Sequence, residues 1–573
     1  MPMKPFFVLS LLLGRTLLAV TVAVLAAIAR AMPVDVMPVT APSGMVVAAH
    51  PQAAAIGVEV LKRGGNAIDA AVAISLAVGV AEPYGSGLGG KLMLLYYEAK
   101  TKKVFVVDGM DACGSALDPE GYRKLSAEAH SYGYSSVCVP GLAAGLWAAH
   151  QNWGVQKWAD DVAPAIGLAR EGFEILPKSR DMFDEQLAKL RRGDTELARL
   201  YLPGGELPAV GARLKNEDLA HTMELLARRG RDGFYRGEVA EKIVAASQRG
   251  GGVLTLDDLA RYEARITEPV AMDFRGYRLV CAPPPALGPA IFLPVLKALE
   301  NENLSGGPLR SVMNLDLLGR FWSVADVQGH RLIGDAGASR EAMEKFLSPD
   351  SIRSLREQAS APVTAKKTVQ LDADAPSEIL GSTTHWLVAD AQGNIVCATQ
   401  SQSLHFGAGV VAPGTGVVLN DTMSDFTFSD QRNPNFVAPG RRPRSTLSPT
   451  ILFRGDRLAF AIGVPGGARI TTAMLQVLLD RLAFDRPLAE AIGDTRVHFV
   501  ASTAQTKVVS FEAETSLPAE LGEGLRARGW KVTLPEEPGR GRHFGGINAI
   551  ELNADGSWTG YADPRRTNLA IGY

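Results

Sequence analysis

The chain has 573 residues, of which 46% are hydrophobic and 21% charged, and its formal net charge is −2. This length corresponds to about three or four domains of about 150 residues and is ample for a large hydrophobic core. The composition is that of ordinary globular proteins, which excludes disordered, collagen-like and disulfide-dense chains. The nearly neutral charge leaves no basic field that would hold a nucleic acid.

The N-terminus predicts an export signal. Lys4 and Arg15 precede or flank apolar stretches, and residues 16–29 are uncharged. A stretch of about 14 residues has the length of a signal-peptide core rather than of a ~20-residue membrane span. Small residues near 27–31 offer an A-x-A cleavage site, so residues 1–31 are predicted to be a signal peptide. An uncleaved membrane anchor is the alternative, and either one predicts a periplasmic or extracellular protein.

Helical patterns dominate the first half of the chain. Helices are predicted at residues 52–61, 67–80, 141 to about 249 and, after the prolines at 283–285, up to 345. Asn66 caps the second of these helices. A glycine-rich turn at 85–90 follows it, and strands are predicted at 92–98 and 104–107.

The composition of the chain changes after residue 360. Residues 360–382 are polar, contain acids and prolines, and show no period, which predicts an exposed and flexible linker. Beyond it, strands are predicted at residues 386–389, 395–399, 416–419, 458–462, 549–552 and 558–562, and a helix at 471–482. The organisation is a helical first part, a linker and a mixed α/β second part.

Two phosphate-binding motifs match in residue type but not in their structural context. Gly85, Gly87 and Gly90 spell G-x-G-x-x-G, and Lys91 nearly completes a phosphate loop. A dinucleotide site needs a strand before this turn and a helix after it, whereas here a helix precedes and a strand follows. The phosphate loop also needs Ser or Thr after the lysine, and Leu92 stands there. No nucleotide cofactor is expected.

Metal and hydrolase motifs are missing as well. The nine histidines include no H-E-x-x-H pair and no carboxylates at the sequence spacing of a metal site, and no G-x-S-x-G elbow occurs. The cysteines are too few and too scattered for a disulfide framework or a zinc site, and we expect them to be small buried side chains; they are Cys113, Cys138, Cys281 and Cys397. No metal is expected.

Residues 381–386, Gly-Ser-Thr-Thr-His-Trp, carry the informative chemistry. Two threonines stand where the predicted linker enters a buried strand. Alone, such a pair is usual at the start of a strand. Segments with strong turn chemistry follow it in order, at residues 420–426, 442–449 and 463–469.

With these segments the chain resembles the γ-glutamyltransferases (γ-glutamyltranspeptidases, glutathione hydrolases), which are N-terminal-nucleophile hydrolases that cut themselves into two subunits. The resemblance runs from about residue 46 to 573 and includes residues 85–90, 139–145, 275–277, 283–285, 383–385, 465–467, 563–565 and 572–573. It implies an α/β fold, a four-layer αββα sandwich. A helix-rich large subunit, 32–382, and an α/β small subunit, 383–573, would build it jointly.

The resemblance assigns the catalytic residues. Thr383 would attack the Ser382–Thr383 peptide bond and become the N-terminal residue of the small subunit. Its own α-amine, with a pKa of about 7.7–8.0, would then serve as the base. Ser401 stands where the family has a second threonine that partners the nucleophile. Gly466 and Gly467 match the pair whose N–H groups form the oxyanion hole.

The resemblance also assigns substrate contacts. Asp425 matches the carboxylate that holds the α-amine of the glutamyl group, and Ser445 and Thr446 match hydroxyls that help bind its α-carboxylate. Turn chemistry alone would also select these residue types, so a local structural role is the alternative for each.

Four substitutions depart from the family pattern. Met110 stands where an arginine clamps the α-carboxylate, which removes a bidentate charged partner. Ser403 replaces Asn, and Thr422 replaces Gln or Glu. Lys91 replaces a glycine, and it is either a substitute cation or a solvated surface lysine. The stretch from 425 to 442 is short, which predicts that a lid loop is missing.

Three hypotheses follow. The first is a self-processing γ-glutamyltransferase that forms an acyl-enzyme on Thr383 from glutathione or a related amide and passes the acyl group to water or an amino acid. The second is an acylase or amidase for a non-glutamyl amide, favoured by Met110. The third is a non-catalytic binding protein of the same fold. The expected partners are a small-molecule substrate and the chain's own two subunits as a heterodimer, with a membrane only if the leader is uncleaved.

Overall fold

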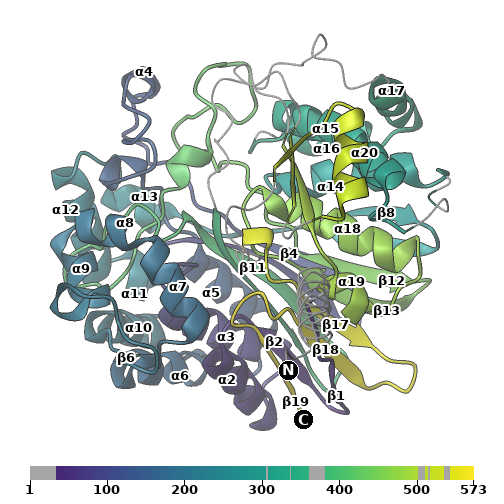
Figure 1. The fold of residues 1–573 in the computed structure, drawn as a ribbon. Helices are drawn as coiled ribbons and strands as arrows, with labels where there is room; N and C mark the ends of the chain where they lie inside the picture. The colour runs from purple at the N-terminus through teal and green to yellow at the C-terminus, as the bar shows by residue number, and fades with distance from the viewer. Residues whose placement is uncertain are drawn as a thin grey trace, which may run out of the picture.

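The computed structural model describes residues 34–573 except 303, 305–307, 336, 361–380, 501–509, 514–516 and 534–542. The predicted leader and most of the predicted linker therefore lie outside the described residues. Figure 1 shows two sheets packed against each other in the middle of the molecule, with helices on both outer sides.

Two seven-stranded sheets form the centre. The order in the first sheet is β1 (Val39–Ala41), β18 (Trp558–Ala562), β17 (Asn548–Leu552), β13 (Arg457–Gly463), β12 (Thr450–Arg454), β9 (Tyr277–Cys281) and β8 (Val270–Phe274). The order in the second is β19 (Leu569–Gly572), β2 (Met45–Ala48), β10 (Gly381–Ala389), β11 (Ile395–Leu404), β3 (Lys91–Glu98), β4 (Lys103–Gly109) and β7 (Arg265–Thr267). Both sheets interleave strands from before and after residue 383, so neither half of the chain builds either of these two sheets alone.

Helices cover the outer face of each sheet. The second sheet is covered by α2 (Pro51–Lys62), α3 (Ala67–Ala81), α5 (Leu142–Trp153), α6 (Trp158–Glu171) and α10 (Glu217–Arg229), which share one apolar core with it. The first sheet is covered by α14 (Leu287–Leu299), α15 (Val312–Leu332), α17 (Pro349–Ser360) and α18 (Arg469–Leu482). A third apolar cluster fills the space between the sheets. This confirms the predicted four-layer αββα sandwich.

Smaller elements complete the described part of the chain. They are α4 (Pro119–Arg123), α7 (Pro177–Glu185), α8 (Leu187–Arg192), α9 (Thr195–Tyr201), α11 (Asp232–Tyr235), α12 (Glu238–Arg249), α13 (Leu256–Arg261), α16 (Ala338–Phe346), α19 (Leu488–Gly493), α20 (Ala519–Ala527), β5 (Phe173–Glu174), β6 (Arg213–Leu214), β14 (Val497–Val500), β15 (Ser510–Ala513), β16 (Lys531–Thr533) and the 3-10 turns η1 (Tyr134–Ser136), η2 (Pro203–Gly205) and η3 (Thr422–Asp425). The predicted helix cap is confirmed, because Asn66 and Asp69 form a reciprocal capping box at the start of α3.

Two sequence predictions are wrong. Residues 416–419 do not form a strand, because Gly414 and Gly416, with φ of 70° and 65°, turn the chain and leave only isolated bridges there. The predicted linker ends too late as well. Gly381 and Ser382 already belong to β10, and Ser382 is only 1% exposed, because both residues pair with the end of β11.

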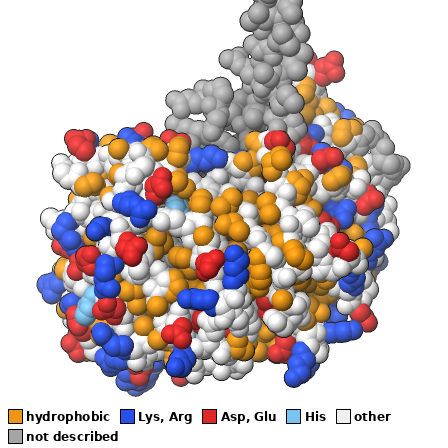
Figure 2. Space-filling model, turned by 90° about the horizontal axis from the view of Figure 1, so that it is seen from below, with side chains coloured by type: hydrophobic (Ala, Val, Ile, Leu, Met, Phe, Trp, Pro, Cys, Tyr) orange, Lys and Arg blue, Asp and Glu red, His pale blue; other side chains and the backbone are white. Residues whose placement is uncertain are grey.

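The surface combines apolar and charged areas. Seen from below, hydrophobic side chains spread over the middle of the face, with charged side chains among them and more densely around them (Figure 2). None of the helices in the described ranges combines the length and the hydropathy that a membrane-spanning segment needs.

A buried ion network ties the end of the chain to the second half of the sandwich. Asp563, which follows β18, forms ion pairs with Arg496 and with Arg565 (3.2 Å), and it accepts the N–H of Ile547 at 3.0 Å. The side chains of Asp563 and Arg496 are fully buried. Burial raises the pKa of Asp563, but the two guanidinium groups lower it by more, so it lies below the usual 3.8.

We expect Asp563→Asn to lower the free energy of unfolding by about 3–5 kcal/mol, because it leaves buried guanidinium charge without its partner. The folded-state pKa of Asp563 is depressed, so the wild-type contribution is present above the pKa of the unfolded chain, about 4, and is lost as the pH falls below it. Thermal or urea unfolding at several pH values measures both effects. Asp485→Asn is the control, since that side chain is 95% exposed and its ion pair with Arg481 contributes little. Equal unfolding midpoints for the two variants would contradict this account.

Candidate active site

The peptide bond between Ser382 and Thr383 lies at an irregularity in the pairing of β10 with β11. Ser382 pairs with Ser403 and Thr384 pairs with Gln400, so β11 carries one residue more than β10 across this step. Ser403, at the edge of the irregularity, has a positive φ of 76°. A bulge of this kind changes the direction in which side chains point and recurs beside active sites.

Two hydroxyls meet at the carbonyl of this bond. Thr383 Oγ1 donates to the Ser382 carbonyl oxygen at 2.7 Å and lies 3.3 Å from Ser401 Oγ. Ser401 Oγ also donates to the Ser382 carbonyl oxygen. Thr383 and Ser401 are 3% and 2% exposed. The geometry therefore places two hydroxyls at one carbonyl oxygen, and one of them belongs to the residue that directly follows the bond.

The predicted glycine pair lies beside the same strand. Gly466 and Gly467 have φ of 147° and 58°, which favours glycine, and only Ala468 separates them from the start of α18. A Cβ added to Gly381 would lie 2.5 Å from the Cα of Gly467, so β10 passes directly against the pair. Thr446 Oγ1 donates to the Gly467 carbonyl at 2.9 Å and fixes the loop. The start of α18 adds the positive end of a helix dipole to this region.

Arg566 and Glu82 contact Thr383 and its neighbours, and no sequence motif had indicated these two residues. Arg566 Nη1 donates to the carbonyl oxygen of Thr383 at 2.9 Å. Glu82 accepts from Thr384 Oγ1 at 2.9 Å and from Thr567 Oγ1 at 3.0 Å. Burial raises the pKa of Glu82, and Arg566 opposes that shift. These contacts fix the backbone immediately after the reactive bond.

The glycine-rich turn 85–90 serves this site by close packing. A Cβ on Gly90 would lie 2.3 Å from the carbonyl oxygen of Ser401, and a Cβ on Gly85 would lie 2.7 Å from Thr384 Oγ1. Glycine lets the turn approach both active-site strands at backbone distance. The turn lies between α3 and β3, as the sequence indicated.

Lys91 forms a buried polar cluster with Asp425, Ser403, Thr422 and Asp111. Lys91 Nζ lies 2.6 Å from Asp425 Oδ2 and donates to Ser403 Oγ at 2.6 Å, with Thr422 Oγ1 at 3.5 Å. Ser403 Oγ donates to the same Asp425 oxygen at 2.8 Å, and Thr422 Oγ1 donates to Asp111 Oδ2 at 2.6 Å. Because Lys91 is 1% exposed, the interpretation of a solvated surface lysine is wrong.

The charged groups of the Lys91 cluster shift one another's pKa. Burial lowers the pKa of Lys91, but Asp425 and Asp111 raise it by more, so it lies above the usual 10.5. Burial raises the pKa of Asp111 to about 7, against the influence of Lys91. Lys91 is therefore charged at neutral pH, and Asp425 is its closest counter-ion.

Not every predicted substrate residue joins this cluster. Met110 is fully buried in the apolar cluster between the sheets. Its backbone N–H donates to Asp108 Oδ1, and its carbonyl accepts from the Tyr262 hydroxyl. Ser445, half-buried, exchanges backbone hydrogen bonds with Pro285 and Leu287 near the glycine pair. Met110 is thus part of the apolar core and brings no charged group to the Lys91 cluster.

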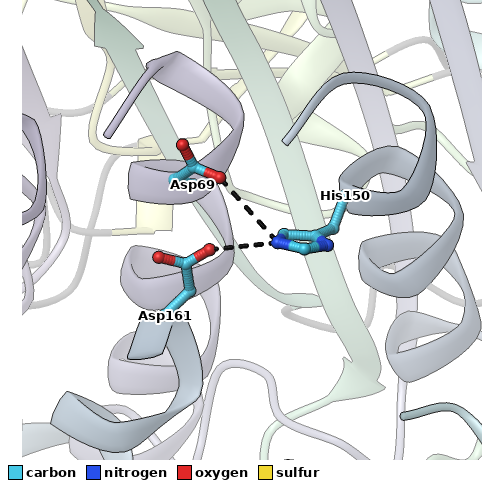
Figure 3. A group of neighbouring side chains, drawn as sticks. All are labelled: Asp69, His150 and Asp161. Carbon is cyan, nitrogen blue, oxygen red and sulfur yellow. Dashed lines mark ion pairs between the residues drawn. The ribbon is translucent and has the colours of Figure 1, made fainter. Parts of the chain in front are cut away.

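A further group of side chains, Asp69, His150 and Asp161, has the spacing of metal ligands, which the sequence motifs missed. His150 Nε2 lies 3.3 Å from Asp161 Oδ2 and 3.8 Å from Asp69 Oδ1, and the three residues come from α3, α5 and α6 (Figure 3). The three residues stand at positions 69, 150 and 161, so no spacing along the chain indicated that they would meet. Sequence separations this large carry no motif.

Asp69 in this group already has backbone partners. Its two oxygens accept the N–H groups of Asn66, Val155 and Gln156 at 2.8–3.2 Å, and His150 Nε2 lies 3.2 Å from the carbonyl of Gln156. Burial raises the pKa of Asp161 to about 6. These bonds join the ends of three helices, which is a structural role for the group.

Comparisons with known proteins cover nearly the whole chain. The family described as Gamma-glutamyltranspeptidase matches residues 53–573. The chain is 32% identical over 550 residues to the glutathione hydrolase proenzyme of Bacillus subtilis (strain 168), covering 92% of this chain and 91% of that protein. It is 32% identical over 536 residues to the acylase ACY 1 proenzyme of Pseudomonas sp. (strain V22), covering 92% of each.

A solved structure has the same fold. The cephalosporin acylase from Bacillus halodurans superposes with a TM-score of 0.82 at 26% identity, over 94% of this chain and 97% of that one. The names of the relatives thus include both glutathione hydrolases and acylases.

We expect Ser401→Ala to slow cleavage of the Ser382–Thr383 bond by about 10²-fold, because the carbonyl oxygen loses a hydroxyl donor as it gains charge. The measurement is a time course of uncleaved chain on denaturing gels.

Ser403→Ala is the matched control on the same strand, since its hydroxyl contacts Lys91 and Asp425 rather than the Ser382 carbonyl. We expect it to cleave at nearly the wild-type rate. Equal cleavage by Ser401→Ala and the wild type would show that this hydroxyl does not act on the carbonyl.

Proposed function

The chain belongs to the gamma-glutamyltranspeptidase family, and on that premise we propose that it is a self-processing enzyme that forms an acyl-enzyme on Thr383 and hydrolyses or transfers the acyl group of an amide. One observation carries the proposal: the hydroxyl of Thr383 lies 2.7 Å from the carbonyl oxygen of the peptide bond before it, and Ser401 contacts the same oxygen.

Self-processing starts at this carbonyl. The Thr383 oxygen attacks the carbonyl carbon of Ser382 while its proton passes to the amide nitrogen, so the C–N bond breaks and an ester replaces the amide. Water then cleaves the ester, leaving a carboxylate on Ser382 and a free α-amine on Thr383. Arg566 and Glu82 hold the backbone after the bond, so the attacking residue is oriented before the reaction.

The two products would remain together as a heterodimer. Strands β10 and β11 from the second part lie between β2 and β3 from the first part, and β18 from the second part pairs with β1 from the first. Separating the pieces would expose both sheets and the cores on their faces. Cleavage also frees the end of the first piece, Gly381–Ser382, from its place beside Gly467. This would open the acyl site to an external substrate.

Turnover would use the groups that cleavage creates. The free α-amine of Thr383, with a pKa of about 7.7–8.0, is partly neutral near pH 7–8 and can accept the proton of its own hydroxyl. The N–H groups of Gly466 and Gly467 would stabilise the oxyanion. Water or an amino acid then releases the acyl group. This chemistry uses only groups of the chain, its substrate and the acceptor.

The acyl group distinguishes the two enzymatic hypotheses. A γ-glutamyl donor such as glutathione agrees with the description of the family and with the name of the Bacillus subtilis relative. A non-glutamyl amide is the second candidate, and it is favoured by Met110, which is buried among apolar side chains and offers an α-carboxylate no charged partner. The hypothesis of a non-catalytic binding protein is set aside, because the chain belongs to a family of enzymes and its hydroxyls are in place.

We expect Thr383→Ala to abolish both self-cleavage and amide hydrolysis. The wild type should give two fragments of about 40 and about 20 kDa, in proportion to its 60.9 kDa, and the smaller one should begin at Thr383. Denaturing gels with N-terminal sequencing check the cleavage, and a panel of acyl anilides checks the hydrolysis.

Thr384→Ala is the neighbouring control, because its hydroxyl contacts Glu82 and not the carbonyl of the reactive bond. It should still give a fragment that begins at Thr383. A Thr383→Ala chain that is cleaved at the same bond would exclude this threonine as the nucleophile.

We also propose that the protein is exported. The support is the apolar, uncharged segment 16–29 with small residues after it. N-terminal sequencing of the large fragment from periplasm or medium should start near residue 30–32. A fragment that starts at Met1 and sediments with membranes would favour the anchor, and a cytoplasmic product would contradict export.

A further inference from the structure

We propose that Lys91 is an internal ammonium that fills the cation-binding place of the active site, so that the acyl donor is an amide whose acyl group carries no ammonium. This inference rests on the proposed function, because it takes Thr383 as the residue that receives the acyl group. It names the substrate class of that site.

The Lys91 cluster lies directly beside the nucleophile. Lys91 is opposite Ser401 in the pairing of β3 with β11, and Ser401 Oγ lies 3.3 Å from Thr383 Oγ1. The backbone N–H of Ser403 donates to Ser401 Oγ at 3.0 Å, and the Ser403 side chain contacts Lys91 Nζ. Directly paired residues of neighbouring strands share one face of the sheet, so Lys91 and Ser401 lie on the same face. The acyl part of a substrate bonded to Thr383 therefore lies close to Lys91.

Asp425 is the carboxylate of this cluster that remains open to solvent. Its side chain is 25% exposed, whereas Lys91 is 1% exposed, and Asp111 is fully buried. A cationic group of a substrate that enters the site would therefore bind at Asp425. One oxygen of Asp425, Oδ2, is already bound by Lys91 Nζ at 2.6 Å and by the Ser403 hydroxyl at 2.8 Å.

A second ammonium is electrostatically disfavoured at this place. It would approach the carboxylate that Lys91 already neutralises, and it would face the Lys91 charge across a few ångströms in a buried setting. Lys91 cannot move readily, because it belongs to a paired residue of β3 and its ammonium is held by three groups of the cluster. An acyl group without an ammonium meets no such repulsion.

Three anilides test the inference on the processed enzyme. γ-L-Glutamyl and glutaryl anilides differ only in the α-ammonium, and a pentanoyl anilide removes the distal carboxylate as well. We expect the glutaryl or the pentanoyl compound to be hydrolysed with a kcat/KM at least about tenfold above the γ-glutamyl compound. Which of the two is faster identifies an anionic or a neutral acyl group. If neither ammonium-free compound exceeds the γ-glutamyl compound tenfold, the inference is overturned.

Two variants assign the preference to Lys91. Lys91→Ala removes the internal ammonium and leaves Asp425 without its cation, so the ratio of γ-glutamyl to ammonium-free hydrolysis should rise at least about tenfold. Lys91→Arg keeps the charge and should keep the wild-type preference. An unchanged ratio in Lys91→Ala would overturn the role of Lys91.

Self-cleavage provides the folding control. A Lys91→Ala chain that yields the fragment starting at Thr383 has assembled the reactive site. If Lys91→Ala is not cleaved, Lys91→Met takes its place, because it keeps the buried stem and removes the charge. The same rise in the ratio of γ-glutamyl to ammonium-free hydrolysis is expected. If neither variant is cleaved, the assignment of Lys91 to substrate choice is overturned. Failure of the wild type to cleave would instead count against the proposed function.

Discussion

The pairing of β10 with β11 around one irregular step is the constraint on which the rest of the site depends. At this step the chain carries the Ser382–Thr383 bond on one strand and, on the other, the hydroxyl of Ser401 that contacts the carbonyl of this bond. The same strand places Ser403 against Lys91 and Asp425. One local distortion of a sheet therefore connects the Ser382–Thr383 bond with the Lys91 cluster, where we propose that the acyl group is recognised.

The sandwich around this pairing makes internal cleavage compatible with a stable protein. Strands from both sides of residue 383 alternate in both sheets, and the apolar cluster between the sheets draws on both parts. Most of the stabilisation of each sheet is therefore independent of the Ser382–Thr383 bond. The buried ion pairs of Asp563 with Arg496 and Arg565 hold the C-terminal end of the chain against the sandwich.

Local signals in the sequence predicted much of the fold. The capped helix at 67–80, the hairpin strands at the C-terminus and the helix at 471–482 all follow from periodicity and turn residues. The predicted strand at 416–419 is wrong, because Gly414 and Gly416 have positive φ and turn the chain, although its apolar pattern is typical of a strand.

Site residues could be predicted where they belong to a continuous sequence motif. They could not be predicted where residues far apart in the sequence meet only in the folded structure. Thr383 and the pair Gly466–Gly467 could be placed from their own segments. The burial of Lys91 could not, because its partner Asp425 is more than three hundred residues away. Arg566 and Glu82 behind Thr383 were missed for the same reason.

We propose that Thr383 becomes the N-terminal nucleophile and carries the acyl group. Intact-mass spectrometry of the small fragment, taken from enzyme quenched in acid during turnover of an acyl anilide, tests this role of Thr383 most directly. We expect a fragment of residues 383–573 whose mass is raised by one acyl group, with the added mass mapped to Thr383. A fragment that begins at another residue, or an acyl group found on another side chain, would contradict it.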